Sequence, residues 1–307
     1  MDLTQYRELN NSFKRTLVFH LGADGGFFSE FNNMLLAILY CLNHEIRFVL
    51  YTRHANFRIH SGWTDFFLPF CDETLHDSHR TLNARYPRRR TPLHHQLTIA
   101  HFKKSQNIDF LTYELWNHFR SPAFAQQTFS FPNTPPLDLL AASQRLIQMI
   151  WRYNPETSAA VAKLSESIDL PKDYLGLHIR SGDKHIETPL LAASQYIEKA
   201  QSLSSLRHFF LSTDNYAIVE EARRHYPHLT FETLCTPEET GYIHADYLKL
   251  PAPIRHSHLL NLFASIERLA ASQHFIGTFS SNPGMYLGMR MNPNQVHSAL
   301  GDTWKIW

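Results

Sequence analysis

The sequence predicts an α/β fold with parallel sheets in two domains. The chain has 307 residues, which is long for one ordinary domain and comfortable for two. Its apolar fraction of 43% and its charged fraction of 19% are typical of a folded globular protein. Short apolar strands alternate with amphipathic helices, as in a parallel sheet covered by helices. A boundary is expected near residues 153–172, which predicts domains of 1–153 and 154–307.

The first domain opens with a strand, a glycine-rich turn, a helix and a second strand. This order at this length predicts a βαβ unit and therefore a parallel pair of strands. Gly25 and Gly26 allow a tight turn before the helix, and Ser29 is a suitable N-cap residue. The strands are expected over residues 16–21 and 46–51, and the helix over about 29–42.

Residues 55–135 are less regular and are rich in aromatic, proline and histidine residues. The segment ARYPRRRTPLHH, residues 84–95, is a short basic loop. We interpret it as a solvated loop, and the alternative is a contact with an anionic acceptor or a membrane surface. After Pro136, an amphipathic pattern predicts a long helix that ends near Arg152.

The second half alternates strands and helices more cleanly, which is the signature of a doubly wound parallel sheet. Its strands are expected over residues 174–180, 208–212, 229–234 and 274–278. Its helices are expected over residues 192–202, 216–225, 256–272 and 283–289.

Composition and charge exclude several classes of function. The net charge of +1 argues against nucleic acid as a partner, because no global field attracts it. Three widely spaced cysteines give neither a disulfide framework nor a zinc-binding spacing. The sequence shows no signal peptide and no transmembrane segment. We therefore expect a cytoplasmic protein, and peripheral contact with a membrane is left open.

Polar residues gather at the ends of three predicted strands of the second half. Ligands of open parallel sheets bind beyond the carboxyl ends of the strands. If the three strands share one sheet, these clusters line one crevice. The clusters comprise His178, Arg180, Asp183 and Lys184; Ser212, Thr213 and Asp214; and Thr278, Ser280, Ser281 and Asn282.

The third cluster is the best candidate for an anion site. Pro283 favours the first turn of a helix, whose N-terminus offers unpaired N–H groups and the positive end of a dipole. The alternative is that a serine or asparagine before Pro283 is simply a helix cap. Arg180 favours the anion site, because a guanidinium can donate two parallel hydrogen bonds to two phosphate oxygens. The alternative for Arg180 is a structural ion pair with Asp183 or Asp214. Together these features favour a diphosphate.

Three carboxylates are candidates for further roles. Asp214 either caps the following helix or accepts a hydrogen bond from a ribose hydroxyl or a guanine N–H group. Glu267 is either a solvated helix residue or a contact to a nucleobase. Glu187 is either a solvated loop residue or a general base. The sequence has no P-loop, no metal-binding His–Glu motif and no Asp-x-Asp pair, so no metal and no cofactor is expected.

Four motifs resemble those of GDP-fucose-dependent fucosyltransferases, in the right order and over most of the chain. The resemblance is to the α-1,6 and nodulation-factor enzymes, and more distantly to the α-1,2 and protein O-fucosyltransferases. The segment HIRSGDK is similar to their H-x-R-x-x-D-K/Y motif, and LSTDN is similar to their T-D-D turn. GTFSSNPGMYL resembles their T-F-S-S segment, and GADGGFFSEFNNMLLAILYCLNHEIRFVL resembles their glycine-rich turn and helix.

The resemblance implies a GT-B fold of two Rossmann-like domains that face a cleft. It implies an inverting, metal-independent transfer of fucose from GDP-fucose to a hydroxyl of a glycan or glycoconjugate. The second domain would bind the donor, and the first would contribute acceptor contacts.

The resemblance also implies roles for candidates that lie in or beside the matched motifs. Arg180 would bind the β-phosphate, and Glu187 would be the candidate base. The remaining donor-binding candidates are His178, Asp183, Lys184, Thr213, Asp214, Glu267, Thr278, Ser280, Ser281, Gly25 and Gly26.

The sequence departs from the family pattern in three places. Ser181 stands where the α-1,6 enzymes have a second arginine, and Asn215 stands where the T-D-D turn has its second aspartate. Glu187 lies one residue closer to Lys184 than the glutamate of the family pattern lies to its lysine. Another nucleotide sugar, or a binding protein without catalytic activity, is the alternative function. A phosphohydrolase is disfavoured, because the sequence lacks its nucleophile motifs.

Overall fold

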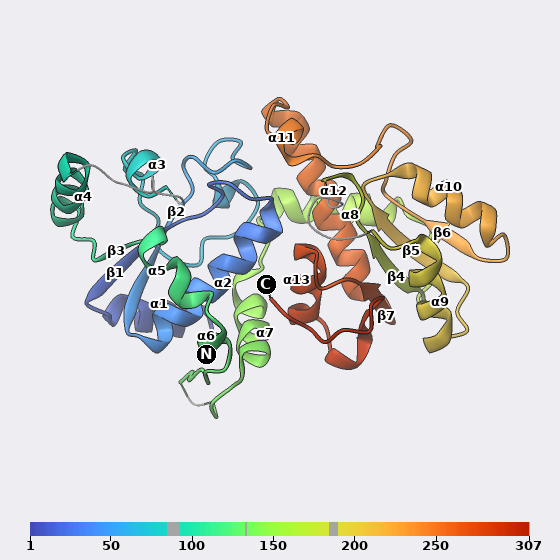
Figure 1. Cartoon of the computed structure of the whole chain (residues 1–307), viewed down its shortest axis with the longest axis horizontal. Coiled ribbons are helices and arrows are strands. Elements are labelled where there is room, and N and C mark those ends of the chain that lie inside the picture. The colour runs from blue at the N-terminus through green and yellow to red at the C-terminus, as the bar shows by residue number, and fades with distance from the viewer. Residues whose placement is uncertain (85–92, 133, 184–189, 307) are drawn as a thin grey trace. The chain divides into compact units, whose positions relative to one another are not determined.

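The computed structural model describes residues 1–84, 93–132, 134–183 and 190–306. The chain divides into two compact units (Figure 1), which we call unit 1, Met1–Asn154, and unit 2, Pro155–Trp307. Each unit contains a parallel sheet with helices packed against it. This confirms the predicted α/β fold with parallel sheets.

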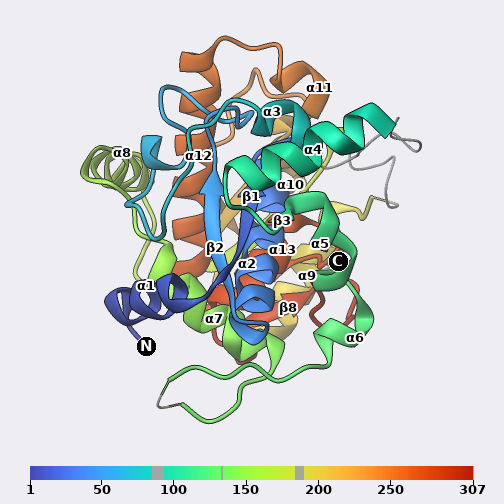
Figure 2. The ribbon, with the colours of Figure 1, turned by 90° about the vertical axis from the view of Figure 1, so that its left-hand side faces the viewer.

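Unit 1 is built around the predicted βαβ unit. β1 (Arg15–His20) pairs in parallel with β2 (Ile46–Tyr51), so that Arg15 lies opposite Ile46 and His20 opposite Tyr51. The short strand β3 (Phe110–Leu111) pairs with the other edge of β1. Helix α2 (Phe27–Asn43) joins β1 to β2 and packs against both strands. Figure 2 shows β1 and β2 side by side in this unit.

Aromatic side chains fill much of the core of unit 1. Trp63 and Phe67 stack with ring centroids 4.4 Å apart, and Trp151 meets Phe67 edge-on at 4.9 Å. The other helices of the unit are α1 (Leu3–Ser12), the 3₁₀ turn η1 (Trp63–Asp65), α3 (His79–Leu82), α4 (Leu93–Ser105), α5 (Thr112–Phe119), α6 (Pro122–Ala125) and α7 (Leu139–Ile150).

Unit 2 contains a five-stranded parallel sheet in the order β6-β5-β4-β7-β8. The chain runs outward from β4 through β5 to β6 and then crosses to β7. This is the doubly wound order, and its switch point lies between β4 and β7. The strands are β4 (Leu175–Ile179), β5 (His208–Thr213), β6 (Thr230–Glu232), β7 (His274–Gly277) and β8 (Val296–Ser298).

Strand β4 is central and buried on both faces, because helices cover the sheet from both sides. Gly176 lets helix α12 approach β4 closely: a Cβ there would lie 2.7 Å from the Ser272 hydroxyl. The helices of unit 2 are α8 (Pro155–Glu166), α9 (Ala193–Leu203), α10 (Tyr216–His225), α11 (His244–Tyr247), α12 (Ala252–Ala271), α13 (Asn282–Arg290) and the 3₁₀ turn η3 (Pro293–Gln295).

Two predicted helix starts and one predicted loop differ from the structure. Helix α2 begins at Phe27 with Gly26 as its N-cap, so Ser29 is not the cap. Helix α12 begins at Ala252 rather than near residue 256, because proline is tolerated in a first helical turn. Of the predicted basic loop, residues 93–95 open helix α4, and residues 85–92 lie outside the described residues.

Candidate functional site

The three polar clusters predicted from the sequence share one edge of the unit 2 sheet. Strands β5, β4 and β7 are parallel neighbours, with His178 opposite Ser212 and Leu177 opposite Ile276. Their carboxyl ends therefore deliver polar residues to the same side of the sheet. The ends of β4 and β7 also flank the switch point, which is where open parallel sheets bind ligands.

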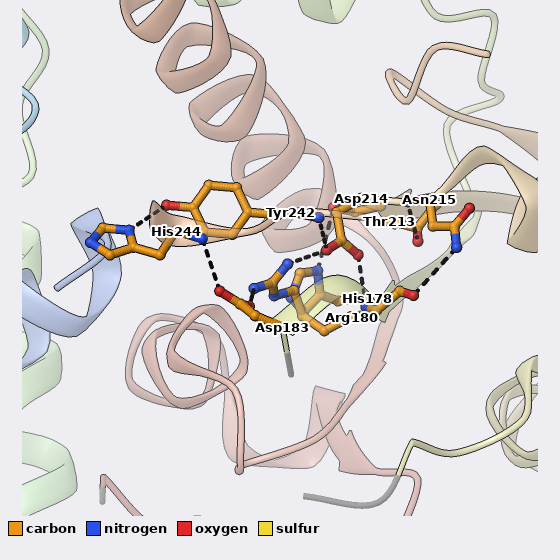
Figure 3. A network of polar contacts seen from close by, with 10 residues as sticks. His178, Arg180, Asp183, Thr213, Asp214, Asn215, Tyr242 and His244 are labelled. Atoms are coloured by element: carbon orange, nitrogen blue, oxygen red, sulfur yellow. Dashed lines mark hydrogen bonds and ion pairs between the residues drawn. The ribbon is translucent and has the colours of Figure 1, made fainter. Parts of the chain in front are cut away.

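Arg180 follows β4 and is held by two carboxylates and an aromatic ring (Figure 3). Its Nη1 pairs with Asp214, and its Nη2 lies 3.0 Å from Asp183 Oδ1. The guanidinium carbon lies 5.0 Å from the centre of the Tyr242 ring. The structural ion pair that the sequence left open is therefore formed, with both aspartates. These bonds engage two of the five guanidinium N–H groups, so the described part of the chain leaves donors for a ligand.

Asp214 organises the end of β5 and does not cap the following helix. Its Oδ1 accepts from Ser181 N at 2.7 Å, and its Oδ2 accepts from Tyr242 N at 2.8 Å. The cap of α10 is Asn215, which accepts from Ala217 N at 3.1 Å. The cap alternative for Asp214 is thus wrong. Its carboxylate joins the ends of two strands to a third segment.

That third segment is residues 240–244, which we call the strap. Asp183 N donates to Tyr242 O at 3.0 Å, and His244 N donates to Asp183 Oδ2 at 2.9 Å. Thr240 forms an antiparallel bridge with Asn215. The strap therefore pairs with the loops after both β4 and β5.

The approach of the strap requires glycine at residue 182. Gly182 has a φ of +53°, and a Cβ there would lie 2.1 Å from Tyr242 O. The sequence does not indicate the strap, because Tyr242 lies far from Arg180 along the chain and in no regular element. The one local signal is the glycine–aromatic pair Gly241–Tyr242.

His178 lies on β4, two residues before Arg180, and is buried. Its Nδ1 lies 3.4 Å from Ser212 Oγ, and its Nε2 has no partner among the described residues. Burial and the neighbouring Arg180 charge lower the pKa of His178 to about 4. The imidazole is therefore neutral at neutral pH, and its Nε2 has unused hydrogen-bonding capacity beside the guanidinium.

Ser281 caps the helix that follows β7. Its Oγ accepts from Gly284 N at 3.2 Å and donates to Thr278 O at 3.0 Å. The hydroxyl of Ser281 is thus used by the cap, and the side chain is buried. Ser280 Oγ contacts Thr278 Oγ1 at 3.2 Å. What α13 presents at the switch point is the positive end of its dipole.

Two further candidates have partners within the fold. Glu267 on α12 bonds to Arg290 on α13, with Arg290 Nη1 2.9 Å from Glu267 Oε1. The pair joins two helices, and contact with a nucleobase stays a prediction. Thr213 Oγ1 accepts from Asn215 N at 3.3 Å at the end of β5.

The glycine turn of unit 1 already contains an anionic group. The buried Glu30 carboxylate accepts from Gly25 N at 2.8 Å and from Gly22 N at 3.1 Å. A phosphate at Gly25 and Gly26 would compete with this carboxylate, so the turn is a poor phosphate site. Glu30 was not among the predicted site residues, although an acidic residue one turn into a helix is a recognisable signal.

Lys184 and Glu187 lie outside the described residues. In the part of the chain that the structure describes, no three His, Cys, Asp or Glu residues are grouped so that they could hold a metal ion. None of the described helices is long and apolar enough to cross a membrane.

Solved structures with a similar fold include two fucosyltransferases. No protein-family model and no curated protein sequence matches the chain. The Bradyrhizobium α-1,6-fucosyltransferase NodZ, co-crystallised with GDP, is similar over 89% of this chain and 91% of its own, with a TM-score of 0.52 and 15% identity. A variant of Arabidopsis thaliana FUT1 in complex with GDP is similar over 90% of this chain and 68% of its own, with a TM-score of 0.51 and 10% identity. The chain has the fold of these fucosyltransferases.

Proposed function

We propose that this protein is a glycosyltransferase that moves fucose from GDP-fucose to a hydroxyl of a glycan or glycoconjugate. The observation that carries the proposal is the position of Arg180: it follows the central strand of unit 2, beside the switch point and next in the sheet to the strand that leads into α13. The fold shared with NodZ, whose crystals were also soaked with GDP-fucose, supports a guanosine diphosphate sugar as the donor.

In this proposal, the guanidinium N–H groups of Arg180 bind the β-phosphate. The bond from the anomeric carbon to the phosphate oxygen breaks in the reaction, so negative charge grows on the diphosphate. A fixed guanidinium and a helix N-terminus stabilise that charge without reorganisation. Asp183 and Asp214 hold the guanidinium in place, and His178 is buried and neutral, so it adds no charge to the site.

The remaining strand-end residues would shape the site. Thr213 and Thr278 fix the turns after β5 and β7 through the bonds described above. Ser281 caps α13 and Ser280 precedes the cap, so both residues would place the positive end of the helix dipole at the diphosphate. Lys184 follows Arg180 by four residues in the sequence. It is therefore a second candidate cation for the phosphates.

The acceptor hydroxyl attacks the anomeric carbon from the face opposite the leaving GDP, which inverts that centre. Its proton passes to a general base, for which Glu187 stays the candidate. In the proposal, Arg180, Lys184 and the positive end of the α13 dipole stabilise the charge on the diphosphate, and the reaction needs no metal ion. A cytoplasmic location stays a prediction from the sequence.

Release of GDP from GDP-fucose tests the proposal. The purified chain is incubated with GDP-fucose and a panel of glycans in excess EDTA, with UDP-glucose and GDP-mannose as alternative donors. We expect release of GDP from GDP-fucose, together with a fucosylated product detected by mass spectrometry. Preference for UDP-glucose or GDP-mannose, or turnover of none of the donors, would contradict the proposal.

Glu187→Gln tests the base separately. We expect the variant to bind GDP as the unmodified chain does and to transfer fucose more slowly, because only the proton acceptor is lost. Full activity of this variant would assign the base to another residue.

A further inference from the structure

The strap contacts Arg180 through several independent interactions. Tyr242 N donates to Asp214 Oδ2 at 2.8 Å, and His244 N donates to Asp183 Oδ2 at 2.9 Å. Each aspartate that pairs with Arg180 is thus bonded to one backbone N–H of the strap. Figure 3 shows the Tyr242 backbone nitrogen bonded to Asp214 and the His244 nitrogen bonded to Asp183.

The ring of Tyr242 adds a contact that no backbone group supplies. Its centre lies 5.0 Å from the guanidinium carbon of Arg180, within the range of a cation–π interaction. Burial raises the pKa of the Tyr242 phenol, which keeps the ring neutral, and its hydroxyl contacts His244 Nδ1 at 2.7 Å. The ring is thus fixed at its hydroxyl end and in contact with the guanidinium.

The charges explain why such a contact is needed. Two carboxylates face one guanidinium, so Arg180, Asp183 and Asp214 together carry one negative charge. Pairing alone would direct the guanidinium toward the carboxylates. A neutral aromatic face attracts the guanidinium without occupying its N–H groups, so these groups stay available to bind a ligand.

We propose that Tyr242 is a positioning residue, whose ring holds the guanidinium of Arg180 in the orientation that binds the β-phosphate of a nucleoside diphosphate. This inference rests on the proposed function, because it requires Arg180 to bind that phosphate. Tyr242 acts through Arg180, and its substitution should therefore affect only ligands that carry a β-phosphate.

The ratio of GDP affinity to GMP affinity isolates this role, because GMP lacks the β-phosphate. In the unmodified chain we expect GDP to bind about 10- to 150-fold more tightly than GMP, as for charge-assisted hydrogen bonds. Tyr242→Leu keeps apolar bulk and removes the aromatic face. We expect it to lower the ratio about fivefold, with GMP affinity unchanged.

Tyr242→Phe is the conservative variant and should keep the ratio within about twofold, since the ring remains. Tyr226→Leu makes the same change in the same unit, but after α10 and before β6, at the opposite edge of the sheet. It should leave the ratio unchanged. If Tyr242→Leu does not fold, Tyr242→Met serves in its place, because it also removes the aromatic face and keeps apolar bulk, and it should lower the ratio in the same direction.

The outcomes separate the two proposals. A folded Tyr242→Leu variant that keeps the GDP to GMP ratio would overturn the positioning role and leave the proposed function standing. A Tyr242→Phe variant as impaired as Tyr242→Leu would also overturn it, because the hydroxyl and not the ring would then matter. If the unmodified chain does not bind GDP, the proposed function fails and this inference fails with it.

Discussion

Asp214, at the end of strand β5, accepts a hydrogen bond from the backbone N–H of Ser181 at 2.7 Å, in the loop after strand β4. The same carboxylate also pairs with Arg180 and with the strap. It is 13% exposed, so its bonds are only partly screened by water. One side chain therefore connects the two neighbouring strand ends on which the candidate site depends.

Asp214→Asn tests this connection. The amide keeps the shape but loses the charge, and it can accept fewer of the three bonds. We expect the free energy of unfolding to fall by about 2 kcal/mol, because charged, partly buried partners are left unsatisfied. Chemical denaturation measures it. Asp246→Asn is the matched control, since Asp246 and Lys249 are exposed, and should cost less than about 0.5 kcal/mol. Equal losses in both variants would contradict the assigned role.

Gly182→Ala tests the close approach of the strap. The new Cβ meets a backbone oxygen, Tyr242 O, at 2.1 Å, and the left-handed φ adds strain. Gly301→Ala isolates the strain alone, because Gly301 has a φ of +73° and open space around it. We expect the free energy of unfolding to fall by about 1 kcal/mol in Gly301→Ala and by at least about 3 kcal/mol in Gly182→Ala. Denaturant titration measures both losses. Similar losses would mean that the strap does not pack on Gly182.

Buried histidines predict loss of stability in acid. Burial lowers the pKa of His20, His79 and His178 to about 4, against an ordinary value of about 6.5. Between these values the unfolded chain binds more protons than the folded chain, so stability falls as the pH is lowered from 6.5 to 4. Each histidine contributes a slope of up to about 1.4 kcal/mol per pH unit.

Denaturant titrations between pH 4 and pH 8 measure this slope. His178→Asn removes one of the groups that bind a proton on unfolding, so it should reduce the slope by up to about 1.4 kcal/mol per pH unit. His208→Asn, at the exposed start of β5, should leave it nearly unchanged. A slope that is the same in the unmodified chain and in His178→Asn would show that His178 is not buried in its neutral form.

Glu267→Gln separates a structural role from contact with a nucleobase. Its carboxylate accepts hydrogen bonds from Arg290, so loss of the carboxylate should loosen the link between α12 and α13. We expect GDP and UDP affinities to fall by the same factor, with their ratio unchanged. We expect Arg290→Gln, too, to lower the GDP and UDP affinities by the same factor. A GDP to UDP ratio that changes only in Glu267→Gln would instead place the carboxylate on the base.

The sequence was enough to locate the strand-end residues, because strands and the polar residues after them are local patterns. The pattern of apolar residues around residues 174–180 and 274–278 predicted β4 and β7. Because the two strands are parallel neighbours, their carboxyl ends lie at the same edge of the sheet. A cap by Ser or Asn before Pro283 was one of the two alternatives for this segment, and Ser281 is that cap.

The strap could not be predicted in this way. Tyr242 meets Arg180 through tertiary pairing, and residues 240–244 have no period that marks them as part of a sheet. The start of α2 was misjudged for a related reason. Glu30 accepts hydrogen bonds from N–H groups of the glycine turn, which favours a helix that begins at Phe27, two residues before the predicted start at residue 29.

Calorimetric titration of the unmodified chain with GDP, UDP and ADP, without added metal, tests the central claim most directly. The account predicts that GDP binds at least about tenfold more tightly than UDP or ADP, a difference of about 1.4 kcal/mol. Equal affinity for the three diphosphates, or binding of none, would contradict a guanosine diphosphate sugar site at Arg180.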